Sequence, residues 1–315
     1  YLKAIAATGV TGVLPTTQEF EAFEIISSLK NEDHDGAEIL GIQAEGPFRS
    51  LKFMGASKGL KWPSPSVDYA RKMVEAAKGN LKYMSVSAEV ENAEAIIKYL
   101  VNQGIRVAGG HSDATYKEAK ESFNWGVSSI SHFGNALRKV HQREGGIAIA
   151  ALLEPEVYIE MIADYVHLSP EIVEAILKIK DHRRIILMSD SNELAYMPKG
   201  KYFARNKERY VDEYGNITIE DGTISGSGKS ILYGIKNLVF KANHPLEEVI
   251  KWASLNPATY FGLSHKGSIQ IGNDADFIIT DERLNLKETI SLGRTIYDSS
   301  IDPLKLVNPK MHNLI

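Results

Sequence analysis

The stretch RVAGGHSDATYKEAKESFNWGVSSISHFGNA, residues Arg106–Ala136, has the pattern of a strand, a turn, a helix, a second strand and a second turn. A histidine follows each predicted strand, His111 after the first and His132 after the second. In a strand–helix–strand unit the two strands are parallel neighbours, so their C-terminal ends lie side by side. We therefore expect the two imidazoles to converge on one point, which suits either a catalytic metal or an ordinary pair of hydrogen-bonded structural histidines.

Composition excludes several classes of function. The chain has 315 residues, a net charge of −4 with both signs interspersed, and no cysteine. It has no basic block of the kind that binds nucleic-acid phosphates and no apolar run long enough to cross a membrane. Without cysteine, a metal would need histidine, aspartate or glutamate ligands. We expect a cytoplasmic protein that binds neither nucleic acid nor membrane.

Strands and helices alternate along most of the chain. Seven short apolar strands are predicted near residues 12, 40, 84, 107, 129, 160 and 187. This alternation predicts an α/β fold, a (β/α)8 barrel of the TIM type, with an open doubly wound sheet as the alternative. Because seven strands are one short of eight and the chain opens on a helix, we expect the first barrel strand to lie upstream of Tyr1.

Two further segments depart from the alternating pattern. Residues Tyr202–Ile224 are predicted to form a hairpin insertion, with turn residues at Tyr214-Gly215-Asn216. From Lys266 onward the sequence changes to short strand patterns, GSIQIG, ADFIIT, KETISLG and RTIYD. We therefore assign residues 1–265 to the barrel and residues 266–315 to the C-terminal strands of a small β-sandwich.

Active-site residues of such a barrel lie at the C-terminal ends of its strands. The residues that follow the predicted strands are Glu45, Ser87, His111, His132, His167 and Asp190. A carboxylate and two imidazoles, from Glu45, His111 and His132, would bind a divalent metal and leave one position open for water. Zinc is the first expectation, with iron, manganese and cobalt as alternatives. Asp190 would then act as the general base.

Several motifs occur in an order that resembles one family. They are EGP at Glu45–Pro47, GHSDATY at Gly110–Tyr116, SHFGNAL at Ser131–Leu137, IADYVHL at Ile162–Leu168 and MSD at Met188–Asp190. Together they resemble the N-acetylglucosamine-6-phosphate deacetylases of the amidohydrolase superfamily. The resemblance implies hydrolysis of the N-acetyl group of an amino-sugar 6-phosphate, with the metal and the acid/base on the residues assigned above.

The resemblance also implies which residues hold the substrate. Asn135, Ala136 and His167 would hold the sugar or its phosphate. Arg143 would reach a phosphate across a homodimer interface, and Ile224 would line the acetyl pocket. Ser57 stands where relatives often have a histidine that helps to polarise the acetyl carbonyl, and serine is a shorter and weaker donor.

Two alternatives stay open at this point. One is an amidohydrolase that acts on a different N-acyl sugar phosphate or amide. The other is a catalytically impaired relative that only binds a sugar phosphate, which the absent first strand and Ser57 would motivate. Against it stands the complete set of Glu45, His111, His132 and Asp190, since an inactive protein need not keep all four. A lysine-bridged cyclic amidase is disfavoured because Glu45 takes the bridging position.

Overall fold

The centre of the protein is a parallel sheet whose strands follow one another in chain order. The computed structural model describes residues 1–30, 32 and 34–301. The six strands of the sheet, in spatial order, are β3 (Ile42–Ala44), β4 (Leu81–Val86), β5 (Arg106–Gly109), β6 (Val127–Ile130), β7 (Tyr158–Met161) and β8 (Ile185–Leu187). Two short strands, β1 (Gly12–Val13) and β2 (Glu38–Ile39), form a separate parallel pair. A strand therefore stands at each of the seven predicted positions, and the one near residue 40 is divided into β2 and β3.

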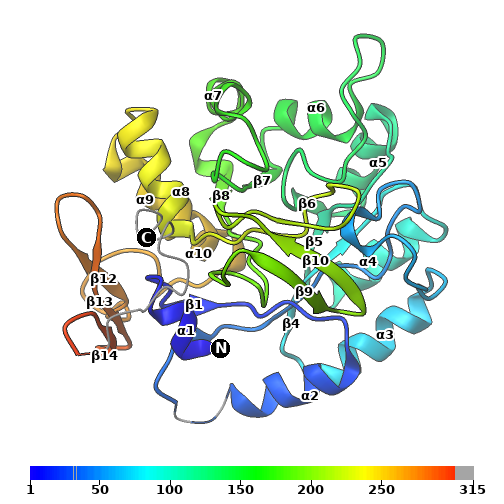
Figure 1. Ribbon diagram of the computed structural model, residues 1–315. Coiled ribbons are helices and arrows are strands. Elements are labelled where there is room, and N and C mark those ends of the chain that lie inside the picture. The colour runs from blue at the N-terminus through cyan, green and yellow to red at the C-terminus, as the bar shows by residue number, and fades with distance from the viewer. Residues whose placement is uncertain (31, 33, 302–315) are drawn as a thin grey trace.

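Helices cover the outer side of this curved sheet (Figure 1). Their first turns carry the expected signals, because Thr115 and Glu118 form a reciprocal capping box at the start of α5 and Pro170 opens α7. The helices are α1 (Leu2–Ala6), α2 (Phe20–Leu29), α3 (Val67–Ala76), α4 (Ala93–Asn102), α5 (Tyr116–Trp125), α6 (Gly146–Leu153), α7 (Pro170–Ile179), α8 (Ile231–Lys236), α9 (Leu246–Ala253) and α10 (Leu255–Phe261), with short turns at η1 (Gly55–Ser57), η2 (His182–Arg184) and η3 (Asn237–Lys241).

The predicted insertion is a three-stranded antiparallel sheet, made of β9 (Gly200–Ala204), β10 (Lys207–Val211) and β11 (Ile217–Thr218). Toward the C-terminus a second antiparallel sheet contains β12 (Phe277–Thr280), β13 (Leu286–Ser291) and β14 (Arg294–Asp298). The prediction of a strand at GSIQIG is wrong: Ile269 is 91% exposed and the segment pairs with none of the described strands. The last predicted residues of this domain, 302–315, lie outside the described residues.

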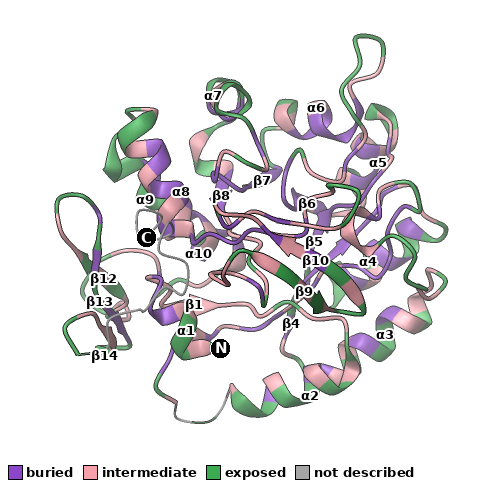
Figure 2. Cartoon of the chain, viewed as in Figure 1, coloured by how far each residue is buried: buried purple, intermediate pink, exposed green. Residues whose placement is uncertain are grey.

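The core lies between the sheet and the helices. Figure 2 shows the central strands buried and the outward faces of the helices exposed. One apolar cluster runs from Phe23 through Ile97 and Ile130 to Trp252. Because both faces of the sheet are covered, its strands read as nearly continuous apolar runs. Among the described residues, no helix is long and apolar enough to cross a membrane.

A polar network lies inside the sheet, below the C-terminal ends of the strands. The carboxylate of Glu160 on β7 accepts hydrogen bonds from the hydroxyls of Tyr83, at 2.9 Å, and Ser129, at 2.8 Å. The hydroxyl of Tyr260 lies 3.0 Å from that of Ser129 and extends the network to α10. Burial raises the pKa of Glu160 to about 7, although the hydrogen bonds from Ser129 and Tyr83 oppose this shift.

The raised pKa of Glu160 predicts a loss of stability as the pH rises. The folded state favours the protonated acid, so its contribution is complete below the unfolded pKa, near 4.5, and is lost as the pH rises through about 7. A shift of this size corresponds to about 3 kcal/mol. The glutamine of Glu160→Gln is neutral at every pH. The free energy of unfolding of this variant, relative to that of the native chain, should therefore increase by about 2–3 kcal/mol between pH 4.5 and pH 8. Urea unfolding at both pH values measures this gain, and parallel profiles would contradict it.

Candidate active site

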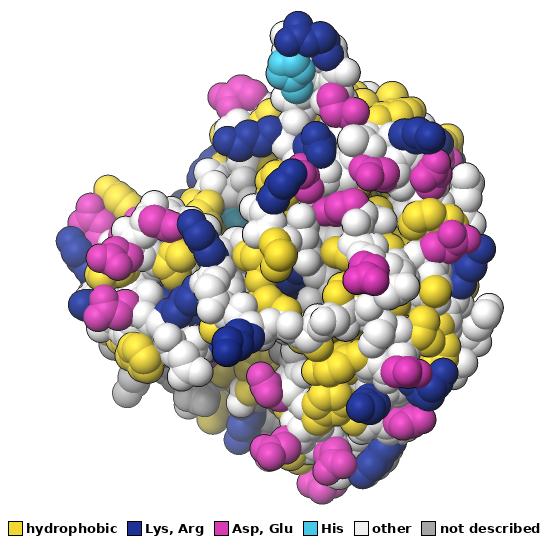
Figure 3. Space-filling model, turned by 90° about the vertical axis from the view of Figure 1, so that its right-hand side faces the viewer, with side chains coloured by type: hydrophobic (Ala, Val, Ile, Leu, Met, Phe, Trp, Pro, Cys, Tyr) yellow, Lys and Arg dark blue, Asp and Glu magenta, His cyan; other side chains and the backbone are white. Residues whose placement is uncertain are grey.

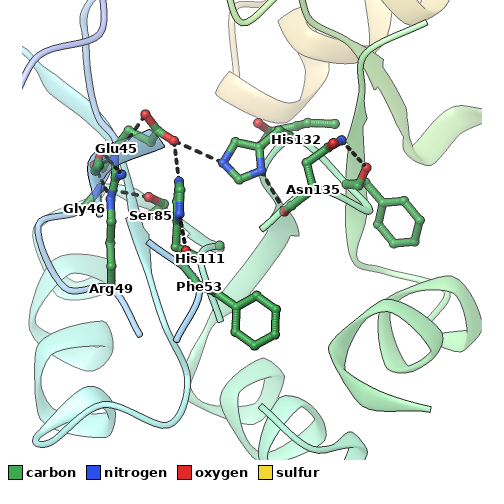
Figure 4. A network of polar contacts seen from close by, with 12 residues as sticks. Glu45, Gly46, Arg49, Phe53, Ser85, His111, His132 and Asn135 are labelled. Carbon is green, nitrogen blue, oxygen red and sulfur yellow. Dashed lines mark hydrogen bonds and ion pairs between the residues drawn. The ribbon is translucent and has the colours of Figure 1, made fainter. Parts of the chain in front are cut away.

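Three potential metal ligands converge at the C-terminal end of the central sheet. Glu45 follows β3, His111 follows β5 and His132 follows β6. The Oε1 atom of Glu45 lies 2.8 Å from Nε2 of His111 and 3.0 Å from Nε2 of His132 (Figure 4). All three donor atoms lie within 4.8 Å of one another. The structure therefore brings together the three residues that the sequence predicts as one site.

The hydrogen bonds of the two imidazoles orient their donor atoms. Nδ1 of His111 lies 2.6 Å from the carbonyl oxygen of Phe53, and Nδ1 of His132 lies 3.1 Å from that of Asn135. A carbonyl oxygen can only accept, so each Nδ1 carries a hydrogen and each Nε2 is directed at Glu45. With a proton on Nε2 the imidazole donates a hydrogen bond to the carboxylate, and without it Nε2 presents a lone pair that can bind a metal ion. Two imidazoles and a carboxylate with this backbone support are a donor set that fits a divalent metal.

The pKa values of the site reflect the close contact between Glu45 and the two histidines. Burial alone would raise the pKa of Glu45, but Arg49 and the two histidines hold it well below its ordinary value. Burial alone would lower the pKa of His132, but the carboxylates of Glu45 and Asp190 raise it to about 9. These two shifts express one ion pair between Glu45 and His132, whereas burial lowers the pKa of His111, opposed by its hydrogen bond to Glu45, so His111 favours a neutral ring that can bind a metal.

Asp190, the predicted base, stands three residues beyond the end of β8. Burial and the nearby negative charge of Glu45 raise the pKa of Asp190 to about 6, while His132 and His167 oppose the shift. Because β8 runs parallel to the other strands of the sheet, Asp190 lies at the same end of the sheet as the three convergent residues.

The backbone at these strand ends is unusual. His111, His132 and Asp190 have φ angles of 48°, 32° and 51°, in the left-handed region that residues other than glycine seldom adopt. Such conformations cost free energy and persist where the surrounding structure enforces them, most often at functional sites. The three residues at the ends of β5, β6 and β8 share this conformation with ten other non-glycine residues of the described chain, so the angles agree with a functional site but do not by themselves identify one.

His167 is held in a fixed orientation by a buried aspartate. Its Nδ1 lies 2.9 Å from Oδ2 of Asp164, which also accepts a hydrogen bond of 2.9 Å from the hydroxyl of Ser227. Despite burial, the hydrogen bond and charge of His167 hold the pKa of Asp164 well below its ordinary value. Nε2 of His167 is buried and has no hydrogen-bond partner among the described residues. An oriented imidazole with one unpaired nitrogen is suited to binding a polar ligand group.

Two of the predicted substrate-binding residues, Asn135 and Ala136, adjoin the convergent site through the backbone. The Asn135 carbonyl accepts from His132, and Ala136, with a φ of 48°, accepts a hydrogen bond from the backbone of Ser112. Ile224 forms an isolated bridge with Thr218, three residues before Ser227. Ser87, which also follows a strand, has a structural role, since its hydroxyl contacts the carbonyl oxygen of Gly110 at 3.1 Å.

Arg143 lies apart from these residues. It is exposed on the loop between β6 and α6, which projects from the body of the molecule (Figure 1). Figure 3 shows Lys/Arg and His side chains on a knob at the top of the molecule, and the exposed residues of this loop include Lys139, His141 and Arg143. Within this chain the structure does not bring Arg143 to the convergent site.

Sequence analysis missed two charged residues of the site, Arg49 and Asp164. Arg49 is 7% exposed and contacts Glu45 four residues earlier, and Asp164 orients His167 three residues later. Asp164 carried a usable signal, because it follows the buried strand β7 closely. Arg49 carried none, since its contacts depend on how the loop after β3 folds back.

Comparison with known proteins identifies the class. The chain belongs to the amidohydrolase family, whose sequence model matches residues 9–308. It is 32% identical to an N-acetylglucosamine-6-phosphate deacetylase of Lysinibacillus sphaericus, over 91% of this chain and 75% of that protein. It is 28% identical to an N-acetylgalactosamine-6-phosphate deacetylase of Escherichia coli O157:H7, over 90% and 76% of the two chains.

A solved structure agrees with these relatives. An N-acetyl-D-glucosamine-6-phosphate deacetylase of Mycobacterium smegmatis, in complex with N-acetyl-D-glucosamine-6-phosphate, superimposes with a TM-score of 0.86 at 27% identity, over 94% of this chain and 79% of that one. The family resemblance drawn from the ordered motifs is confirmed, and so is an α/β amidohydrolase fold with a parallel sheet, whereas the complete eight-stranded barrel stays a prediction.

Proposed function

We propose that this enzyme hydrolyses the N-acetyl group of N-acetylglucosamine 6-phosphate to give glucosamine 6-phosphate and acetate. The observation that carries the proposal is the convergence of Glu45, His111 and His132 on one point, with Asp190 at the same end of the sheet. The deacetylase relatives identify the reaction class for a site of this chemistry.

Glu45, His111 and His132 would hold one divalent metal ion, for which zinc is our first choice and iron, manganese and cobalt also suit the donors. When bound, such an ion activates water and polarises a carbonyl group. The Glu45 side chain is 21% exposed whereas those of His111 and His132 are 8% and 5% exposed. Water and substrate would therefore reach the site from the side of the carboxylate.

Asp190 would move the proton. Its carboxylate accepts a proton from the water that attacks the acetyl carbon. It then delivers the proton to the sugar nitrogen as the C–N bond breaks, leaving acetate and the free amine. Burial and the charge of Glu45 raise the pKa of Asp190, which suits both steps, because such a carboxylate takes up a proton more readily than an ordinary one.

Substrate contacts would surround this centre. The unpaired Nε2 of His167 would accept from a sugar hydroxyl or, when protonated, bind the phosphate, and Asn135 and Ala136 would offer backbone and amide groups. Ile224 would line the acetyl pocket. Ser57 accepts a hydrogen bond of 3.2 Å from Arg49 and would contribute its hydroxyl near the acetyl oxygen.

Arg143 would bind the phosphate of a substrate held in the partner chain of a homodimer. Charge-assisted hydrogen bonds of this kind contribute about 1.5–3 kcal/mol. We expect Arg143→Ala to raise KM by about 10–100-fold with little change in kcat, measured by steady-state kinetics. Lys139→Ala removes a positive charge from the same exposed loop and should leave KM within about twofold. Equal effects of both variants, or a monomer in sedimentation experiments, would contradict this role.

The proposal includes a division of the chain into two domains. Residues 1–265 would form the catalytic barrel, and the C-terminal strands would complete a small β-sandwich. Support comes from Lys266, whose Nζ contacts Glu38, Asp274 and Asp276 at 2.6–2.8 Å and joins the β12–β14 region to the start of the barrel.

The test is acetate release by the purified full chain loaded with zinc. We expect equal amounts of acetate and free amine from N-acetylglucosamine 6-phosphate and a lower kcat/KM for the galactosamine epimer, the substrate class named for one relative. Faster hydrolysis of the epimer would reassign the substrate. Tight binding of both sugar phosphates with no acetate released, in protein that contains metal, would favour the catalytically impaired alternative.

A further inference from the structure

Arg49 is a buried cation in direct contact with Glu45, one of the proposed metal ligands. Its side chain is 3% exposed, and Nη2 lies 3.1 Å from Oε2 of Glu45. Burying an arginine this fully is costly unless its hydrogen bonds are satisfied.

Arg49 is fixed by four contacts in addition to that ion pair. Its Nε donates to the backbone carbonyl of Glu45 at 3.1 Å, and its Nη2 donates to the same oxygen. Its Nη1 donates to the hydroxyl of Ser57 at 3.2 Å, and its guanidinium carbon lies 5.0 Å from the ring centre of Trp62. A guanidinium with so many partners has one orientation, and it holds the Glu45 carboxylate in one orientation too.

The two oxygens of Glu45 consequently face different partners. Oε1 faces the Nε2 atoms of His111 and His132, whereas Oε2 faces Arg49. Figure 4 shows this division, with Arg49 to the left of the carboxylate and His132 to its right. A free carboxylate can bind one metal ion through both oxygens or join two ions, one on each oxygen.

We propose that Arg49 is a positioning residue that restricts Glu45 to binding a divalent ion through Oε1 alone, which leaves Oε2 unavailable to the same ion or to a second one. Turning Oε2 toward the metal would break the ion pair and leave the guanidinium buried without its counter-charge. A second ion at Oε2 would lie against a fixed positive charge. The inference rests on the proposed function, because it assumes that Glu45, His111 and His132 bind a metal.

The described part of the chain has a second cluster of carboxylates, and we expect it to bind no divalent ion. Glu38, Asp274 and Asp276 lie close enough together to be considered a cation site. The ammonium group of Lys266 already occupies the space between them, within 2.8 Å of each carboxylate.

The test replaces the native metal with cobalt(II), whose visible absorption weakens as its coordination number rises. We expect the native chain to bind one tight equivalent of cobalt. Arg49→Leu should also bind one equivalent but with weaker absorption per ion, because both oxygens of Glu45 become ligands. Arg49→Lys keeps a positive charge near Oε2 and should restore the native spectrum. Trp62→Leu removes the stacking partner but keeps the ion pair, and should leave the spectrum native.

Each result bears on the proposal, and none depends on measuring activity. Two tight equivalents in the native chain would overturn it, as would a native spectrum in folded Arg49→Leu. If Arg49→Leu does not fold, the stoichiometry of the native chain and the spectrum of Arg49→Lys still test the proposal, and a weakened Arg49→Lys spectrum would overturn it. If the native chain binds no cobalt, the metal site and with it the proposed function are wrong. One equivalent with unchanged variant spectra refutes the role of Arg49 alone.

Discussion

Asp190→Asn is expected to lower kcat for acetate release by about 10²–10⁴-fold while the protein keeps its metal. The amide has nearly the same shape as the carboxylate but cannot take a proton from water or pass one to the leaving nitrogen. The fold should tolerate the change, since the φ angle of Asp190 is 51° and asparagine adopts this left-handed conformation readily. The measurements are kcat under saturating substrate and metal content by elemental analysis.

A matched control separates loss of the base from general damage. Asp181→Asn is the same substitution at a side chain that is 40% exposed at the start of η2. It should leave kcat within about twofold. Unchanged turnover in Asp190→Asn would show that another group moves the proton. Loss of metal together with turnover would instead make Asp190 a ligand.

The fold was largely predictable because buried parallel strands leave a strong local signal. Strands covered on both faces are short continuous apolar runs, so β4 to β8 could be located without tertiary information. The failure at Gly267–Gly272 has the opposite cause. Its alternation of apolar and polar residues fits a strand, but a strand also needs a partner, and Ile269 remains exposed. Local pattern alone does not contain that information.

The convergence of Glu45, His111 and His132 was predictable for a topological reason. In a parallel barrel all C-terminal strand ends meet at one face, so residues far apart in sequence, such as Glu45 and His132, can be grouped before their distance is known. No such rule exists for residues that act through a loop. Arg49 belongs to the loop after β3, and its contacts with Ser57 and Trp62 arise only when that loop folds back. The buried Glu160 also escaped notice, because the hydroxyls that bind its carboxylate come from two other strands.

His132→Asn should abolish tight metal binding and, with it, acetate release. His132 provides one of the three side-chain donors that converge at this point in the described part of the chain, and the shorter asparagine cannot place a donor where Nε2 lies, 3.0 Å from Glu45. Loss of an outer partner of a metal ligand weakens binding by about 10–100-fold, so loss of a ligand itself should cost more. Asparagine accommodates the φ of 32° at this position, which keeps the backbone in place.

Zinc affinity measured by competition with a chelator, together with acetate release at saturating zinc, tests this expectation. His265→Asn makes the same change at a side chain that is 58% exposed, and should match the native chain in both measurements. Native zinc affinity in His132→Asn would remove His132 from the metal site. The raised pKa of His132 would then reflect only a proton shared with Glu45, and the enzyme would need another source of positive charge at this point. Lost affinity with normal activity would separate catalysis from the metal, so both measurements must fall together for the assignment to stand.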